Sequence, residues 1–214
     1  MNLNLSVDEL LTTTRAVRKR LDLEKPVPHE VVIECLELAT QAPTGSNKQG
    51  WQWVFVEDAD KKKALADIYR ETFNKYLTMP KPAYDEKDVR AQRMSRVNDS
   101  GEYLAEHLHE VPVLLVPCLQ GRPGDVSAQS ARFWASLFPA VWSFMLALRS
   151  RGLGSTWTAM HLLGNGERRA AEILGIPYEQ YRQGALLPVA YTLGTDFQPA
   201  KRLPVENIVH WDSW

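Results

Sequence analysis

This 214-residue sequence has only two cysteines, no histidine pattern typical of a metal site and no marked excess of either charge. The two cysteines, Cys35 and Cys118, form no CxxC pair and lie in apolar patterns, so we expect buried, reduced thiols and no disulfide framework. The sequence has 25 Lys and Arg against 26 Asp and Glu, which leaves no basic field of the kind that nucleic-acid binding usually needs. We therefore expect no nucleic-acid partner.

A leader peptide and long uncharged apolar runs are also lacking. The first residues, Met1 to Leu5, have neither a charged start nor a long apolar segment, and no stretch approaches ~18 uncharged apolar residues. The sequence thus predicts a soluble, cytoplasmic protein with no membrane partner.

The common catalytic motifs are absent as well. Gly152-Leu153-Gly154 is followed by Trp157 where a GxGxxG motif needs its third glycine, and neither a Walker loop nor a GxSxG elbow occurs. The five histidines show no HExxH or Cys/His spacing, so no metal site is predicted. A chain without a visible nucleophile or general base is typical of an enzyme whose reaction belongs to a bound cofactor.

The sequence has instead the composition and patterning of one folded domain, with 44% hydrophobic residues. Periodicity and capping residues predict helices at 6–15, 28–42, 60–76, 127–149 and 167–174. Apolar runs predict strands at 51–56, 111–119, 155–160 and 185–193. We expect residues 77–101 to form a mobile loop leading into an exposed helix, the strand with Pro112 and Pro117 to have an edge-like end, and the almost uncharged stretch 127–149 to be the central buried helix.

Two segments carry side chains that suit a phosphorylated, planar ligand. Arg15 and Arg18 are three residues apart, so on a helix both guanidinium groups can converge on one phosphate. Residues 44–50, Thr-Gly-Ser-Asn-Lys-Gln-Gly, form a polar loop before a strand. Hydroxyl and amide groups in such a loop can bind the carbonyls and nitrogens of a planar polar ring.

The order and spacing of these segments resemble the N-terminal signature of the FMN-dependent nitroreductase family. The signature joins Arg15-Ala16-Val17-Arg18, a proline-containing turn and helix, and Ala-Pro-Thr-Gly-Ser-Asn-x-Gln-x-Trp at 42–51. The likeness continues through Gly-Leu-Gly-Ser-Thr-Trp at 152–157, through 188–194 and through Lys201-Arg202, and it covers most of the chain outside residues 77–126. The sequence departs from the usual family pattern at Thr14, Ala16 and Gly50, where Arg, Ser and Pro are common.

The resemblance implies an α+β fold in which a central, mostly antiparallel sheet is flanked by helices. A single nitroreductase-like, FMN-binding domain would cover residues 1–214. Within it, residues 77–126 would be a variable region of loop, helix and second strand, and residues 195–214 would be a C-terminal arm. The helix at 127–149 would lie at the core of a homodimer in which each arm extends over the partner.

The resemblance also implies which residues bind FMN. Arg15 and Arg18, with Ala16 between them, would hold the phosphate and the pyrimidine edge of the flavin, and the division between the two arginines stays open. Lys201 and Arg202 would complete the phosphate site. The other subunit would contribute four polar side chains of the loop, Thr44, Ser46, Asn47 and Gln49. The flavin face would be lined by Trp157, Thr158 and Ala159.

The implied reaction is hydride transfer from NADH or NADPH to flavin N5, followed by reduction of a small-molecule acceptor such as a nitroaromatic or a quinone. One flavin face would serve both reactants in a ping-pong cycle, and no protein side chain would be catalytic. Two alternatives stay open: reductive dehalogenation or flavin fragmentation, as in relatives with a similar arginine-rich motif, and a nonenzymatic flavin-binding module. Arg90, Arg93 and Arg96 are candidates for binding a 2′-phosphate of the donor.

Overall fold

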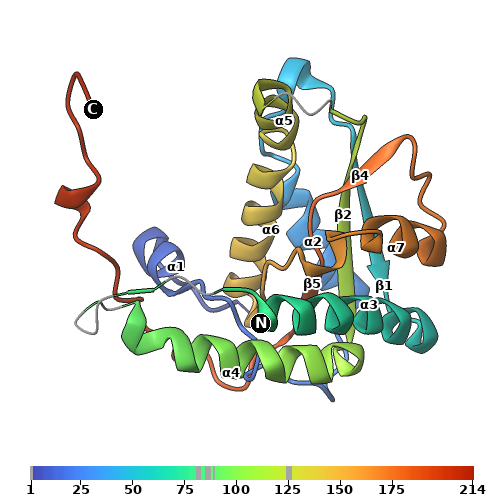
Figure 1. Cartoon of the computed structure of the whole chain (residues 1–214). Helices are drawn as coiled ribbons and strands as arrows, with labels where there is room; N and C mark the ends of the chain where they lie inside the picture. The colour runs from blue at the N-terminus through green and yellow to red at the C-terminus, as the bar shows by residue number, and fades with distance from the viewer. Residues whose placement is uncertain (1, 81–82, 85–87, 89, 124–126) are drawn as a thin grey trace.

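An antiparallel sheet lies at the centre of the computed structural model, which describes all residues except 1, 81–82, 85–87, 89 and 124–126 (Figure 1). The main path has the order β1-β2-β5-β3, and β4 pairs with the other end of β2. The strands are, in that order, Trp51–Val56, Val113–Gln120, Leu187–Tyr191, Leu153–Ser155 and, for β4, Tyr181–Gln183. All strand pairs of the described residues are antiparallel, which confirms the sheet expected from the sequence.

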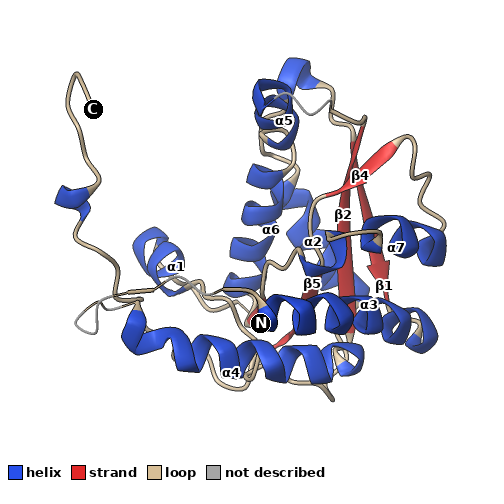
Figure 2. Ribbon diagram, viewed as in Figure 1, coloured by secondary structure: helices blue, strands red, loops and turns tan. Residues whose placement is uncertain are grey.

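Helices cover both faces of this sheet (Figure 2). Helices α2 (His29–Ala39) and α6 (Phe138–Ser150) pack on one face. The other face carries α3 (Ala59–Thr78), α4 (Ala91–His107) and α7 (Gly166–Leu174). The predicted α+β architecture is therefore confirmed.

Strand β2 is central, and its side chains alternate between the two cores. Val113 and Leu115 pack in the core that contains α2 and α6, whereas Leu114 and Val116 pack in the core that contains α3, α4 and α7. A strand that is covered on both faces needs apolar residues at every position. This requirement explains the unbroken apolar run in this part of the sequence.

Pro117 lies inside β2 at a position where its missing N–H is not needed. Strand β2 pairs with β5 through Val113–Leu115 and with β4 through Cys118–Gln120, so Pro117 falls where one neighbour gives way to the other. Its carbonyl oxygen accepts a hydrogen bond from the Gly184 N–H at 2.8 Å. The sequence-based prediction of an edge-like end was wrong, because this gap between neighbours tolerates proline within a central strand.

The predicted helix at 127–149 is two helices. Helix α5 covers Ser127–Trp134, and α6 begins at Phe138 with Pro139 in its first turn. Proline lacks the N–H that a continuous helix requires, and its ring clashes with the preceding turn. A new helix therefore starts here, and Phe144 at its centre is completely buried against the sheet.

Within the described residues, the helical stretch Ala128–Ser150 also has the length and the mean hydropathy, 1.3, of a membrane span. That likeness is one of length and composition only. In the fold, Phe144 and Leu148 of this stretch are completely buried among core residues. Phe138 and Trp142 remain 37% and 41% exposed on the outer side of α6.

The first helix is shorter than predicted. Helix α1 spans Val7–Thr13 and begins with the expected capping box: the Glu9 N–H donates to Ser6 Oγ at 3.2 Å, and the Ser6 N–H donates to Glu9 Oε2 at 2.8 Å. The chain becomes extended at Thr14. The arginine motif consequently lies beyond the helix.

Smaller differences concern the remaining elements. The strand predicted at 155–160 is displaced to Leu153–Ser155, and the short strand β4 was not predicted. The exposed helix expected before residue 101 is α4, which begins at Ala91. Much of the loop predicted between α3 and α4 lies outside the described residues.

The C-terminal segment leaves the body of the domain (Figure 1). Its first part is held by Arg20, which pairs with Asp196 and donates from Nε to the Leu193 carbonyl at 2.9 Å. Beyond Arg202 the chain carries apolar side chains that are largely exposed, namely Val205, Ile208, Trp211 and Trp214. Such a segment has the properties that the sequence predicted for an arm.

Candidate functional site

The arginine motif runs beside strand β3. Ala16 and Ser155 form a parallel bridge, and the Val17 N–H donates to the Ser155 carbonyl at 2.9 Å. Gly154 permits this approach, since a Cβ there would lie 3.0 Å from Val17 Cβ. The prediction that Arg15 and Arg18 share a helix face is therefore wrong, and their side chains have different surroundings.

Arg15 belongs to a cluster of cations from three chain segments. Burial lowers the pKa of Arg15, and the positive charges of Arg202 and Arg93 lower it further. Arg93, on α4, donates from Nη1 to the carbonyl of Lys201 at 3.3 Å, which holds the tail beside the helix. No carboxylate of the described residues forms an ion pair with Arg15, Arg93 or Arg202. Such a cluster suits an anion with several oxygens.

Arg18 faces another part of the molecule. Burial lowers the pKa of Arg18, and the same side chain lies within electrostatic reach of Tyr69 on α3. Tyr69 is 3% exposed, and its pKa is raised, because the effect of burial exceeds the opposite effect of the Arg18 charge. The motif therefore presents two separate cations, one at the arginine cluster and one toward α3.

Buried hydroxyl groups lie next to the motif. Ser155 Oγ and Thr156 Oγ1 are buried, and neither has a hydrogen-bond partner among the described residues. A buried polar atom without a partner is costly, so these hydroxyls are available to bond a water molecule or a ligand beside the motif. Sequence reasoning missed both of them, although they lie inside the Gly-Leu-Gly-Ser-Thr-Trp segment.

The three residues that follow have distinct environments. The Trp157 ring packs edge-on against Phe138 of α6, with ring centroids 5.0 Å apart. The Thr158 hydroxyl donates to the Leu186 carbonyl at 3.0 Å, so this side chain is already occupied. Ala159 is exposed. The segment thus leads from the arginine motif toward the beginning of α6.

The polar loop adopts an unusual backbone around the short 3₁₀ turn Gly45–Asn47. Ser46, Asn47 and Gln49 have φ values of 55°, 52° and 48°, in the left-handed region that non-glycine residues rarely adopt. Local hydrogen bonds hold this shape: the Gln49 N–H donates to Thr44 Oγ1 at 3.2 Å, and Gln49 Nε2 donates to Asn47 Oδ1 at 2.9 Å. Backbone strain of this kind clusters at functional sites.

The loop and the arginine cluster lie at opposite ends of α6 (Figure 1). The Gly45 N–H donates to Ser136 Oγ at 3.0 Å, just before α6 begins. Arg149, in the last turn of α6, donates from Nη2 to Thr13 Oγ1 at 3.1 Å and to the Thr195 carbonyl at 3.0 Å. The 13 residues of α6 separate these anchor points by about 20 Å. The structure therefore brings Arg15, Arg202 and the Lys201 backbone together but leaves the predicted loop residues apart from them.

Comparisons with known proteins agree with the fold and the motif. The family model "Nitroreductase family" matches residues 11–191. An NADH dehydrogenase of Thermus thermophilus is 26% identical over 94% of this chain and 97% of its own length. Iodotyrosine deiodinase 1 of Rattus norvegicus is 27% identical over 94% of this chain and 67% of its own length.

Solved structures show the same similarity. An oxidized iodotyrosine deiodinase bound to FMN and 3-iodo-L-tyrosine has a TM-score of 0.71 and 25% identity, with 98% of this chain and 100% of that chain covered. The FMN and NADPH-dependent nitroreductase NfnB from Sphigopyxis sp. strain HMH has a TM-score of 0.71 at 20% identity, with the same coverage, and this likeness shows the fold alone. Because the family model spans the arginine motif and every strand of the sheet, the chain belongs to the nitroreductase family.

Proposed function

We propose that this protein is an FMN-dependent NAD(P)H oxidoreductase that reduces small electron-poor acceptors such as nitroaromatics or quinones. The observation that carries the proposal is the arginine cluster of Arg15, Arg93 and Arg202, which no described carboxylate neutralises. Arg15 of this cluster lies in the segment that pairs with Ser155, beside the unpartnered hydroxyls of Ser155 and Thr156.

The chemistry of these donors fits the phosphate of FMN. A phosphate dianion accepts several hydrogen bonds, and each guanidinium offers a fork of N–H donors with matching geometry. Cations held together without a counter-ion repel one another, so an anion that joins them removes an unfavourable interaction. FMN ends in such a phosphate, whereas FAD does not. We assign Arg15, Arg93 and Arg202 to the phosphate, with Lys201 positioned beside them by its backbone.

The second cation of the motif suits the ring of the cofactor. Bound FMN would supply a hydride acceptor and donor, for which the chain offers no substitute of its own. Arg18 would place a fixed positive charge at the pyrimidine edge, where negative charge accumulates on reduction. Trp157, Thr158 and Ala159 would line the ring. Thr158 would do so through its backbone, because its hydroxyl already donates to the Leu186 carbonyl.

A homodimer with shared sites completes the proposal. Phe138 and Trp142 are large apolar side chains left partly exposed on α6, and the arm beyond Arg202 exposes further ones. A second copy covering these surfaces would bring its own polar loop toward the flavin ring. We therefore assign Thr44, Ser46, Asn47 and Gln49 to the partner's site. Sedimentation at low micromolar concentration should give a dimer, and a folded monomer that retains FMN would contradict the shared site.

Reductive dehalogenation is the second candidate reaction. The observation in its favour is that named relatives include iodotyrosine deiodinases, one from Rattus norvegicus and one, 28% identical, from Thermotoga neapolitana. A nonenzymatic flavin-binding module would instead hold FMN that no nicotinamide reduces.

We also propose a cytoplasmic location, with which the two buried free cysteines are compatible.

Identification of the bound chromophore tests this function first. The protein should purify yellow, and heat should release FMN, identified by its mass. Turnover of a nitroaromatic, a quinone and a halotyrosine with each nicotinamide then separates the two reactions. FAD in place of FMN, or no flavin after reconstitution, would defeat the proposal.

A further inference from the structure

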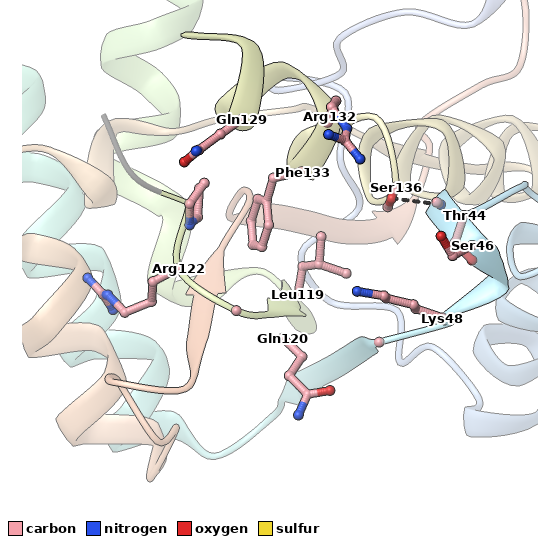
Figure 3. A pocket seen from close by; sticks show the side chains of 14 residues that line it. Thr44, Ser46, Lys48, Leu119, Gln120, Arg122, Gln129, Arg132, Phe133 and Ser136 are labelled. Atoms are coloured by element: carbon pink, nitrogen blue, oxygen red, sulfur yellow. Dashed lines mark hydrogen bonds between the residues drawn. The ribbon is translucent and has the colours of Figure 1, made fainter. Parts of the chain in front are cut away.

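A cavity of about 420 Å³ opens between the polar loop, the end of β2 and helix α5 (Figure 3). It shares no lining residue with the arginine cluster. The side chains that define its character are Lys48, Leu119, Gln120, Arg132, Phe133 and Ser136. None of the described residues that line it carries a carboxylate.

Two cationic side chains, from different elements, line this cavity. Lys48 extends its ammonium group from the loop toward Leu119, and Arg132 approaches from α5 (Figure 3). Neither side chain forms an ion pair with a described residue. Arg122 is on the rim but is turned away: its guanidinium lies 4.1 Å from the centroid of the Tyr178 ring and donates to the Tyr178 carbonyl.

The floor between the cations is apolar. Leu119 is 5% exposed, and the half-buried Phe133 ring lies beside it in the cavity wall. Gly121, with φ of 110°, gives Phe133 its space, since a Cβ there would lie 3.3 Å from the ring. A flat apolar wall with one positive charge from the loop and one from α5 is complementary to an aromatic ring that bears an anionic group.

Hydrogen bonds hold the backbone of the loop in place around Lys48. Lys48 lies between Asn47 and Gln49, both left-handed, and the loop is fixed by the bonds of Gly45 to Ser136 and of Gln49 to Thr44. Because these hydrogen bonds hold the backbone, the Cα atom of Lys48 stays at the edge of the cavity, while its exposed side chain can still turn. Lys48 can therefore place its ammonium group at the cavity without any movement of the loop.

We propose that this cavity binds the carboxylate end of an aromatic acceptor, so that the protein prefers aromatic acids to neutral aromatics. This inference rests on the proposed function, in which the same loop reaches the flavin ring of a shared site. An acceptor lying on that ring would have its far end beside Lys48 and Arg132. A neutral acceptor fills the same space but leaves both cations without a partner.

The test compares 4-nitrobenzoate with 4-nitrobenzamide, which have the same ring and differ in charge. For the FMN-loaded protein, we expect the KM of the carboxylate to be about tenfold lower than that of the amide. Lys48→Met and Arg132→Gln should each reduce this KM ratio about threefold, and the double variant should bring it near one. Lys61→Met, which removes the charge of an exposed lysine on α3, is the control for net charge and should keep the wild-type ratio.

Calorimetric titration of the oxidized protein with both compounds gives the same comparison without turnover. If neither compound is reduced but the titration shows the carboxylate binding about tenfold tighter, lost in the double variant, the proposed reaction fails and the cavity assignment stands. A KM ratio and a Kd ratio near one in the wild type, or ratios that the double variant leaves unchanged, would overturn the inference. Half-molar salt should also shrink the ratio, because it screens the two cations.

Discussion

Arg93 on α4 donates from Nη1 to the carbonyl oxygen of Lys201, 3.3 Å away, and thereby joins this helix to the C-terminal segment. Lys201 precedes Arg202, whose charge acts on Arg15 together with that of Arg93. Residues far apart in the sequence therefore form one cationic site. Its members can be tested one at a time.

The first prediction concerns Arg93. Arg93→Gln should weaken FMN binding about tenfold, because it removes one guanidinium from the phosphate and releases the tail. Quenching of FMN fluorescence on titration with the flavin-free protein measures this. Arg96→Gln is the matched control, one turn further along α4, exposed and without a described side-chain partner. Equal losses in both variants would indicate a general charge effect and remove Arg93 from the site.

The second prediction separates the roles of Arg15 and Arg18. Arg15→Ala should cost about 1.5–3 kcal/mol of FMN binding and leave riboflavin binding nearly unchanged, because riboflavin has no phosphate. Arg18→Ala should weaken the binding of FMN and riboflavin alike, since its charge is assigned to the ring. Titration of each variant with both flavins decides the matter, and the reverse pattern would exchange the two assignments.

The third prediction tests the contact that positions the arginine motif. In Gly154→Ala the new Cβ would lie 2.6 Å from Thr192 Cγ2 and 3.0 Å from Val17 Cβ. We expect a loss of about 1–3 kcal/mol in the free energy of unfolding and weaker FMN binding. Gly50→Ala places its Cβ 3.3 Å from Gln120 Cβ, a less severe contact than the 2.6 Å at Gly154, and should cost less. Urea unfolding of both variants gives the comparison, and a Gly154→Ala protein of wild-type stability would show that this packing is not tight.

The fourth prediction follows from His161, which is completely buried and bonded through Nε2 to Gln183 Oε1 at 3.2 Å. Burial lowers the pKa of His161 to about 4, from an ordinary value of 6.5. Between these two pH values His161 binds a proton in the unfolded chain but stays neutral in the folded protein. Stability should therefore be full above pH 6.5 and should fall, by about 3 kcal/mol, as the pH drops toward 4.

His161→Gln isolates this contribution, because an amide can still donate to Gln183 but does not titrate. With FMN at saturation, the difference in free energy of unfolding between wild type and variant should narrow as the pH falls from 7 to 4.5. A difference that is constant with pH would mean that His161 is protonated in the fold as readily as in the unfolded chain.

The sheet, most helices and the Ser6–Glu9 capping box could be predicted from the sequence, since local periodicity and capping chemistry determine them. The edge-like end predicted from Pro117 was wrong, because proline is tolerated there only where β4 replaces β5 beside β2. That arrangement depends on tertiary structure and has no local sequence signal. Pro139 is the local signal that divides the helix predicted at 127–149, because proline is favoured in the first turn of a helix and not in its interior.

The candidate site was less accessible from the sequence. The helix predicted through Arg15 ends at Thr13, because the following segment pairs with Ser155, a contact across some 140 residues that no local pattern reveals. The sequence suggests Arg93 only as a ligand for the 2′-phosphate of the donor, since nothing in it relates α4 to the tail. The Ser155 and Thr156 hydroxyls became candidates only when the structure left them without partners.

Anaerobic mixing of the purified yellow protein with NADH or NADPH tests the central claim most directly. We expect the visible absorbance of the flavin to disappear with at least one nicotinamide and to return when a nitroaromatic is added afterwards. Initial rates with both reactants varied should then give parallel double-reciprocal lines, because one flavin face serves donor and acceptor in turn. Absorbance that persists with both nicotinamides would contradict the assignment of this chain as an NAD(P)H oxidoreductase.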